Sequence, residues 1–269
     1  AFFLFGLHKG VAGVATATVI SRIINLVIVV LLGAVLVKAK QHPERESNRE
    51  VMGQIIRIGL PSACETAIYN VSMTLVIRFL NQMDAQGLNV TARSYTMQIT
   101  NFSYCVGAAL AQANAIMTGW HIGAKEYDAC DRGTRKAAII GVIVAVILET
   151  MFALCSGWIM QLFSKDPQMV SLVGKLLAID IVLEMGRVTN LVYGQALKTS
   201  GDAVFPVVMG ACFMILCSVG GTYLFGIRLG LLAVGAYIGM AGDECVRAVG
   251  MYLRWKSGKW KEKGLVKSR

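Results

Sequence analysis

The chain has 269 residues, of which 55% are hydrophobic and 16% are charged, with a net charge of +10 at pH 7. The apolar residues gather in long stretches, which indicates an integral membrane protein. The basic residues lie in short connections beside these stretches, where membrane topology explains them, so we expect no nucleic-acid partner. Seven cysteines without a pairing pattern argue against a disulfide framework or a zinc site, and we expect no metal.

Seven apolar stretches are long enough to cross the hydrocarbon core of a bilayer, which takes about 20 residues. They cover residues 12–37, 53–80, 89–118, 135–162, 169–197, 203–226 and 231–254. The sequence therefore predicts an all-α fold, a multi-pass helical bundle. Connections on one side carry 16 basic residues and those on the other side carry two. By the positive-inside rule, we expect a bacterial inner or plasma membrane protein with linker 41–50 and the C-terminal tail in the cytoplasm.

The first and last stretches resemble each other. Residues 10–17 read GVAGVATA and residues 230–237 read GLLAVGAY, and each stretch ends in basic residues. The offset contains six spans, so both copies run in the same direction, as in the parallel repeats of secondary transporters. The predicted organisation is the last helix of an N-terminal lobe (1–40), a cytoplasmic interlobe linker (41–50), a complete six-helix C-terminal lobe (51–255) and a basic cytoplasmic tail (256–269). We expect about five more helices upstream, so the missing N-terminal lobe would be a partner.

The second span contains a carboxylate, which is costly inside a membrane and so needs a reason. Glu65 follows Pro61 by one helical turn, and proline removes a backbone donor and kinks a helix. The freed carbonyl and the carboxylate would then face a cavity and form a cation site. The alternative is a glutamate that is hydrogen-bonded to a neighbouring helix and holds the bundle together.

The fifth span carries Asp180, Glu184, Arg187 and Asn190. Asp180, Glu184 and Arg187 share one helix face because they are spaced by three and four residues. One arginine can neutralise one carboxylate and leave the other ready to bind a proton or a cation. The alternative is a buried structural ion pair.

A pocket that suits apolar or amphipathic molecules is a further hypothesis. Tyr69, Met73, Met97 and Phe102 could line it, since methionine adapts to varied shapes. The alternative is ordinary helix packing. The sequence contains no phosphate-binding loop and no hydrolase motif, so we expect neither an enzyme nor a cofactor. Energy for transport would then come from an ion gradient.

Three stretches resemble the multidrug and toxic compound extrusion (MATE) family of transporters. Residues 57–65 read RIGLPSACE and are similar to the start of that family's seventh helix. Residues 107–124 resemble the end of the eighth helix and its turn. Residues 184–190 (EMGRVTN) and 196–202 (ALKTSGD) resemble the tenth helix and its turn.

The resemblance implies twelve helices in two lobes around a central cavity. It implies a xenobiotic antiporter that exports small organic cations or amphipathic drugs in exchange for Na⁺ or H⁺. Acids in the seventh and tenth helices would be coupling sites, and these correspond to Glu65 and to Glu184 or Asp180. The alternatives are a lipid-linked saccharide flippase of the same superfamily and a non-transporting structural subunit. Membrane lipids would be partners in each case.

Overall fold

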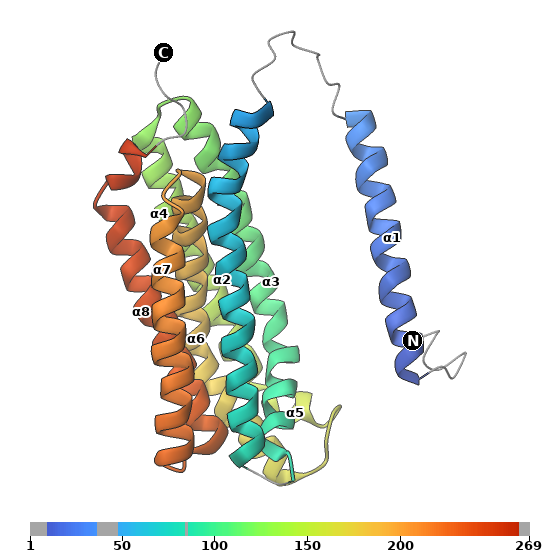
Figure 1. Cartoon of the computed structure of the whole chain (residues 1–269). Coiled ribbons are helices and arrows are strands. Elements are labelled where there is room, and N and C mark those ends of the chain that lie inside the picture. Colours follow the sequence, from blue (N-terminus) through green and yellow to red (C-terminus); the bar gives the residue numbers. More distant parts are fainter. Residues whose placement is uncertain (1–9, 37–47, 84–85, 264–269) are drawn as a thin grey trace. The chain divides into compact units, whose positions relative to one another are not determined.

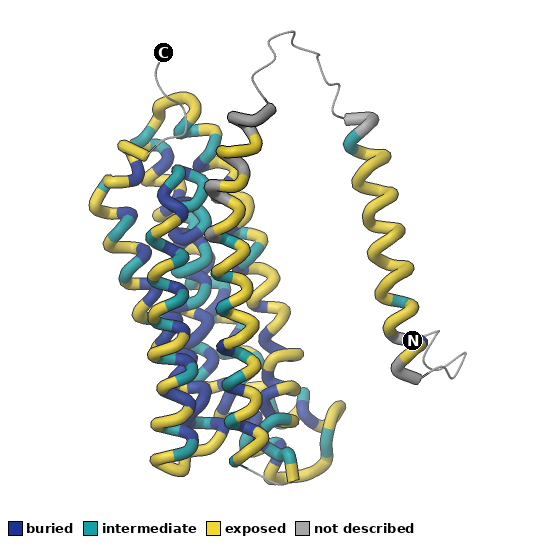
Figure 2. Tube along the Cα trace, viewed as in Figure 1, coloured by how far each residue is buried: buried dark blue, intermediate teal, exposed yellow. Residues whose placement is uncertain are grey.

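The computed structural model describes residues 10–36, 48–83 and 86–263. The chain divides into two compact units, Ala1–Val51 and Met52–Arg269. In the first unit, α1 (Gly10–Leu36) is a 27-residue helix whose described side chains are nearly all exposed (Figure 2). Residues 1–9, most of the predicted linker 41–50 and residues 264–269 of the predicted tail lie outside the described part.

The second unit is an antiparallel helix bundle, which Figure 1 shows from the side. Its elements are α2 (Asn48–Met83) from Met52 onward, α3 (Leu88–Gly123), α4 (Tyr127–Leu154), α5 (Ser156–Met160), α6 (Pro167–Thr199), α7 (Val204–Phe213), η2 (Met214–Val219), η3 (Thr222–Arg228), α8 (Leu232–Lys256) and η4 (Lys259–Glu262). The described residues form helices and no strand, as predicted. Because successive long helices run in opposite directions, the connections 124–126 and 200–203 lie at the same end of the bundle as η4.

Each predicted span corresponds to helical structure, although the bounds differ. The fourth span was predicted over 135–162, but α4 begins at Tyr127 and ends at Leu154. The helix starts early because its first turns, which are polar, lie beyond the apolar stretch that the prediction followed. Its end is followed by the short α5, which runs from Ser156 to Met160.

Apolar composition alone identifies fewer spans than helix length does. Among the described residues, Ala15–Gly33, Tyr127–Leu154 and Val204–Arg228 are both long and apolar enough to cross a membrane. α2, α3, α6 and α8 have 36, 36, 33 and 25 residues, which is also long enough. These four helices contain more polar side chains, and many of those side chains line a cavity inside the bundle.

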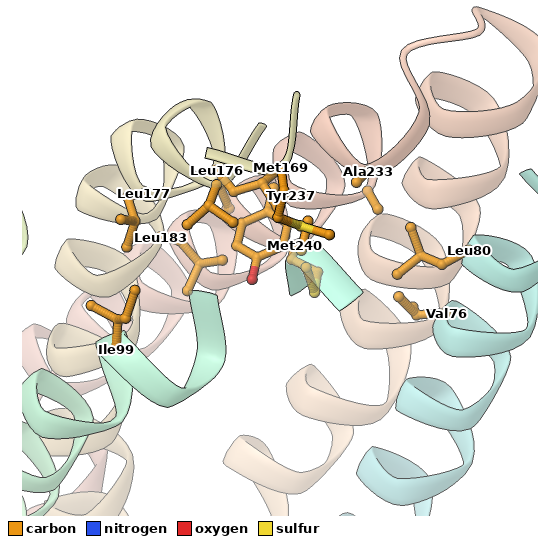
Figure 3. Packing of buried hydrophobic residues seen from close by; sticks show 14 of the residues in the cluster. Val76, Leu80, Ile99, Met169, Leu176, Leu177, Leu183, Ala233, Tyr237 and Met240 are labelled. Atoms are coloured by element: carbon orange, nitrogen blue, oxygen red, sulfur yellow. The ribbon is translucent and has the colours of Figure 1, made fainter. Parts of the chain in front are cut away.

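α6 lies in the middle of the bundle and packs against α3, α4 and α8. Leu176, Leu177 and Leu183 on this helix are at most 1% exposed. They belong to an apolar cluster that also contains Ile99 of α3 and Tyr237 of α8 (Figure 3). Because α6 is covered on several sides, its polar residues are held in fixed positions inside the bundle.

The last two spans of the bundle approach each other through glycines. The sixth span changes from α-helix to π-helix after Phe213, and its second half packs against α8. A Cβ atom added to Gly239 would lie 2.9 Å from the backbone carbon of Gly221 and 3.0 Å from the nitrogen of Thr222. The Gly235-x-x-x-Gly239 pattern in the sequence therefore marks a close backbone contact.

We predict that Gly239→Ala destabilises the protein by about 1–3 kcal/mol, because the new methyl group meets backbone atoms that cannot turn away. Gly242→Ala on the same helix is the matched control, since a Cβ there meets nothing within 4 Å. It should stabilise the helix by up to about 1 kcal/mol through helix propensity. Thermal unfolding of the two purified variants tests this, and equal melting temperatures would contradict the close contact.

Candidate functional site

A cavity of about 620 Å³ lies inside the second unit. Its walls come from α2, α3, α6, α8 and η2. On α3 the lining residues are spaced by three and four positions, so one face of that helix forms the wall. The lining residues are Ser62, Glu65, Thr66, Tyr69, Met73, Arg93, Met97, Thr100, Asn101, Tyr104, Asp180, Leu183, Arg187, Asn190, Leu191, Gln195, Lys198, Met214, Ser218, Tyr237, Met240, Asp243, Glu244 and Arg247.

Glu65 on α2 makes an ion pair with Lys198 near the end of α6. The distance from Lys198 Nζ to Glu65 Oε2 is 2.6 Å, and each side chain is about one-fifth exposed. Gly210 of α7 packs against the same carboxylate, since a Cβ on Gly210 would lie 3.6 Å from Glu65 Oε1. The predicted cation-binding glutamate therefore already has a cationic partner from the protein in this conformation.

Arg187 of α6 lies between two carboxylates. Its Nη1 donates to Glu184 Oε1 at 3.1 Å, as the three-residue spacing predicted, and its Nε lies 3.6 Å from Glu244 Oε1 on α8. Asn190 donates to the other oxygen of Glu244 at 3.0 Å. Gly186 makes the contact possible, because a Cβ there would be 2.8 Å from the carbonyl carbon of Glu244. Four residues from two helices thus form one network.

Arg247 extends this network along α8. Its Nη2 lies 2.9 Å from Glu244 Oε1, and it donates two hydrogen bonds of 3.0 Å to Asp243. Ser218 of η2 donates to Asp243 at 2.9 Å. The charges therefore alternate between acid and base through the bundle, which offsets much of the cost of burying them.

Three buried carboxyl groups keep oxygen atoms without a hydrogen-bond partner among the described residues. These are Oδ2 of Asp180, Oε2 of Glu184 and both oxygens of Glu149. Asp180 is 2% exposed and lines the cavity, whereas Glu149 of α4 is fully buried outside it. A buried oxygen of this kind can accept a proton or bind a cation without first losing another partner.

Arg93 is the cationic counterpart on α3. Its side chain lines the cavity and is 7% exposed. Its Nη2 makes a long contact of 3.7 Å with Met73 Sδ, and its Nε has no hydrogen-bond partner among the described residues. The cavity thus contains an unneutralised base at Arg93 as well as the partly unpaired acid Asp180.

The cavity includes most of the residues that the sequence suggested. Tyr69, Met73 and Met97 line it, together with Asp180, Arg187 and Asn190. Glu184 does not line it but binds Arg187. Phe102 does not line it either, and 70% of its surface is exposed. The physical reason is helical phase, since Phe102 points away from the face that carries Met97, Asn101 and Tyr104.

Pro61 lies within α2, which continues as one α-helix from Asn48 to Met83. Its side chain lies outside the described part, and the kink stays a prediction. Lys198 and Arg247 were missed as site residues, because Lys198 had been counted only as a loop charge. A signal for Arg247 was present in the sequence, since Asp243 and Glu244 precede it by four and three residues.

Comparison with known proteins gives consistent results. Residues 61–224 match the MatE family model. The uncharacterized transporter YisQ of Bacillus subtilis is 34% identical, over 98% of this chain and 58% of YisQ. The probable multidrug resistance protein YoeA of the same organism is 22% identical, over 98% of this chain and 58% of YoeA. The chain therefore spans less than two thirds of these relatives.

The fold agrees with solved structures. The crystal structure of the eukaryotic MATE transporter AtDTX14 superposes with a TM-score of 0.83 at 17% identity, covering 97% of this chain and 59% of that one. Members of the family are membrane transporters and not enzymes. The matched residues 61–224 include α3, α4 and α6 together with the Glu65–Lys198 and Glu184–Arg187 pairs. Because the match covers more than half of the chain, the chain belongs to the MatE family of multidrug and toxic compound extrusion transporters.

Proposed function

We propose that the protein containing this chain is a secondary active exporter that moves cationic or amphipathic small molecules outward in exchange for Na⁺ or H⁺. One observation carries the proposal. A cavity inside the bundle of a MatE-family chain is lined by Asp180, a buried acid with one oxygen that has no hydrogen-bond partner among the described residues. Exchange needs a group of this kind, which holds the coupling ion in one state and the substrate or no ion in another.

The lining favours positively charged, partly apolar molecules. Four carboxyl groups and four basic groups line the cavity. Glu184, which is paired with Arg187 outside the lining, adds a fifth carboxyl group, so acids outnumber bases by one. Tyr69, Met73 and Met97 add aromatic and thioether surface, which adapts to varied ligand shapes. A flippase for lipid-linked saccharides would need several free arginines for pyrophosphate. Arg187 and Arg247 are instead neutralised by acids.

The role of Glu65 in coupling can be tested in the full-length protein. Glu65→Gln should leave membrane expression near normal and abolish gradient-driven efflux, because the amide cannot exchange Lys198 for a proton or cation. Uptake of a fluorescent organic cation into everted vesicles, driven by a higher Na⁺ or H⁺ concentration in the lumen, measures this, because export from the cell becomes uptake in an inside-out vesicle.

Lys198→Met is the paired control for Glu65→Gln. It removes the same ion pair but keeps the titratable carboxylate, so it should retain gradient dependence, with an altered pH or Na⁺ profile. Equal losses in both variants, with no further loss in the double variant, would show that Glu65 only positions Lys198.

Substitutions at Asp180 and Glu244 distinguish ion binding from structural ion pairing. Asp180→Asn should unfold near the parent temperature but lose coupling, because the unpaired Asp180 oxygen holds no neighbour in place. Glu244→Gln should lower stability by about 1–3 kcal/mol, because Arg187 and Arg247 both lose a charged partner, although each keeps a second carboxylate. The melting temperatures and the vesicle fluxes of both variants test this. A strongly destabilised Asp180→Asn protein with normal coupling would show that Asp180 is structural and does not bind the coupling ion.

The orientation of the bundle in the membrane can also be tested. The end of the bundle that carries η4 should face the cytoplasm of a bacterial cell, because that end holds the basic connections. In a cysteine-free background, Gln86→Cys should react with an impermeant maleimide added to intact cells, and Lys125→Cys should react only after lysis. Both positions are exposed, whereas the native Cys130 is 1% exposed and would stay unlabelled from either side. The opposite labelling would overturn the topology.

A further inference from the structure

A second cavity lies at the end of the bundle that carries η4. It has a volume of about 220 Å³ and lies between the first turns of α4 and the last turns of α8, with η4 along its rim. It shares no lining residue with the central cavity. We propose that this second cavity binds the phosphate headgroup of an anionic glycerophospholipid.

The chain after α8 is fixed in place and completes the cavity. Gly258, with a φ of 72°, reverses the direction of the backbone, so that Trp260 folds back onto Trp255. The two rings are stacked, with centroids 4.2 Å apart and planes at 8°. Trp260 Nε1 also donates to the carbonyl oxygen of Trp255 at 3.0 Å. Both rings are 2% exposed, so this fold-back is a packed part of the bundle and not a loose end.

A buried carboxylate provides the second anchor. Asp202 accepts hydrogen bonds of 2.7 Å from Arg254 and from Lys263, which lies beyond η4. Burial alone would raise the pKa of Asp202, but the hydrogen bonds from Arg254 and Lys263 outweigh it and hold the pKa below the usual value. The Asp202 carboxylate is therefore ionised at neutral pH and keeps η4 against the bundle.

The cavity carries an excess of positive charge. Its one acid, Asp131, accepts the indole hydrogen bond of Trp255 at 2.8 Å. Arg135, Lys256 and Lys261 also line the cavity and are exposed, and the structure shows no ion pair of these three with a described acid. Three basic groups around one small cavity suit a phosphate, which can accept hydrogen bonds from all of them.

The surface next to the cavity indicates a lipid rather than a soluble anion. Below Arg135 on α4, Ile139, Ile143 and Ile147 follow at four-residue spacing and are 51–62% exposed. From Arg135 to Ile147 the helix rises roughly 18 Å, about half the thickness of a bilayer core or slightly more. A phospholipid could thus place its phosphate in the cavity and an acyl chain along this apolar stripe.

Native mass spectrometry of the purified full-length protein tests the proposal, with phosphatidylglycerol and phosphatidylcholine of identical acyl chains as the added lipids. Phosphatidylglycerol should remain bound and phosphatidylcholine should not. The combined variant Arg135→Gln, Lys256→Gln and Lys261→Gln should bind phosphatidylglycerol about 100-fold more weakly.

The matched control removes three exposed basic residues from the same end of the bundle that do not line the cavity, through Arg132→Gln, Lys136→Gln and Lys259→Gln. This variant should bind phosphatidylglycerol like the parent. Equal weakening in both variants would show general surface attraction and overturn the site.

Competition with inorganic phosphate and glycerol 3-phosphate tests whether the site needs the whole lipid or only a phosphate group. Neither should displace phosphatidylglycerol at concentrations comparable to the lipid, because neither can use the isoleucine stripe. Displacement by either would replace the lipid proposal with a soluble-anion site. Thermal unfolding without lipid checks that the two triple variants are equally folded, and because this site lies outside the central cavity, its result is independent of the transport assays.

Discussion

Charge compensation between α6 and α8 is the constraint on which the bundle depends. An isolated charge in the middle of a membrane costs about 2.5–3.5 kcal/mol on insertion scales. The bundle contains Arg187 and Arg247, and each lies against two carboxylates. The arrangement requires the two helices to be close and in a fixed register. Gly186 provides the closeness, and the apolar cluster around Leu183 and Tyr237 holds the register.

This network leaves some charges unmatched, and the unmatched charges face the cavity or lie near it. Asp180 and Arg93 both line the cavity with polar atoms that have no partner among the described residues. Buried polar groups in proteins usually find partners, so such exceptions point to places where a ligand or ion completes the set. We therefore interpret the pairs within the α6–α8 network as maintaining the fold, and we propose the unpaired Asp180 and Arg93, together with the separate Glu65–Lys198 pair, as the candidates for transport.

Much of this was visible in the sequence. The seven spans followed from the length of the apolar stretches and the pairing of Glu184 with Arg187 from helical spacing, while Tyr69, Met73 and Met97 were suggested as cavity residues by their residue type. Contacts between distant segments did not follow. Lys198 meets Glu65 across 133 positions, and only the tertiary structure brings them together. The fold-back of Trp260 onto Trp255 depends on a positive φ at Gly258, and a single glycine in a basic tail gives little signal for it.

The way α2 is held has a mechanical consequence. Towards its Met83 end, α2 is anchored by Val76 and Leu80, which are fully buried in the apolar cluster. Along its other half, the described side chains are mostly exposed, and the Glu65–Lys198 ion pair ties that half to α6. An ion that displaced Lys198 from Glu65 would release one half of this helix while the other stayed clamped. Exchange of the partner of Glu65 would then let the Glu65 half of α2 pivot about its anchored half and move the cavity wall, while the α6–α8 core stayed in place.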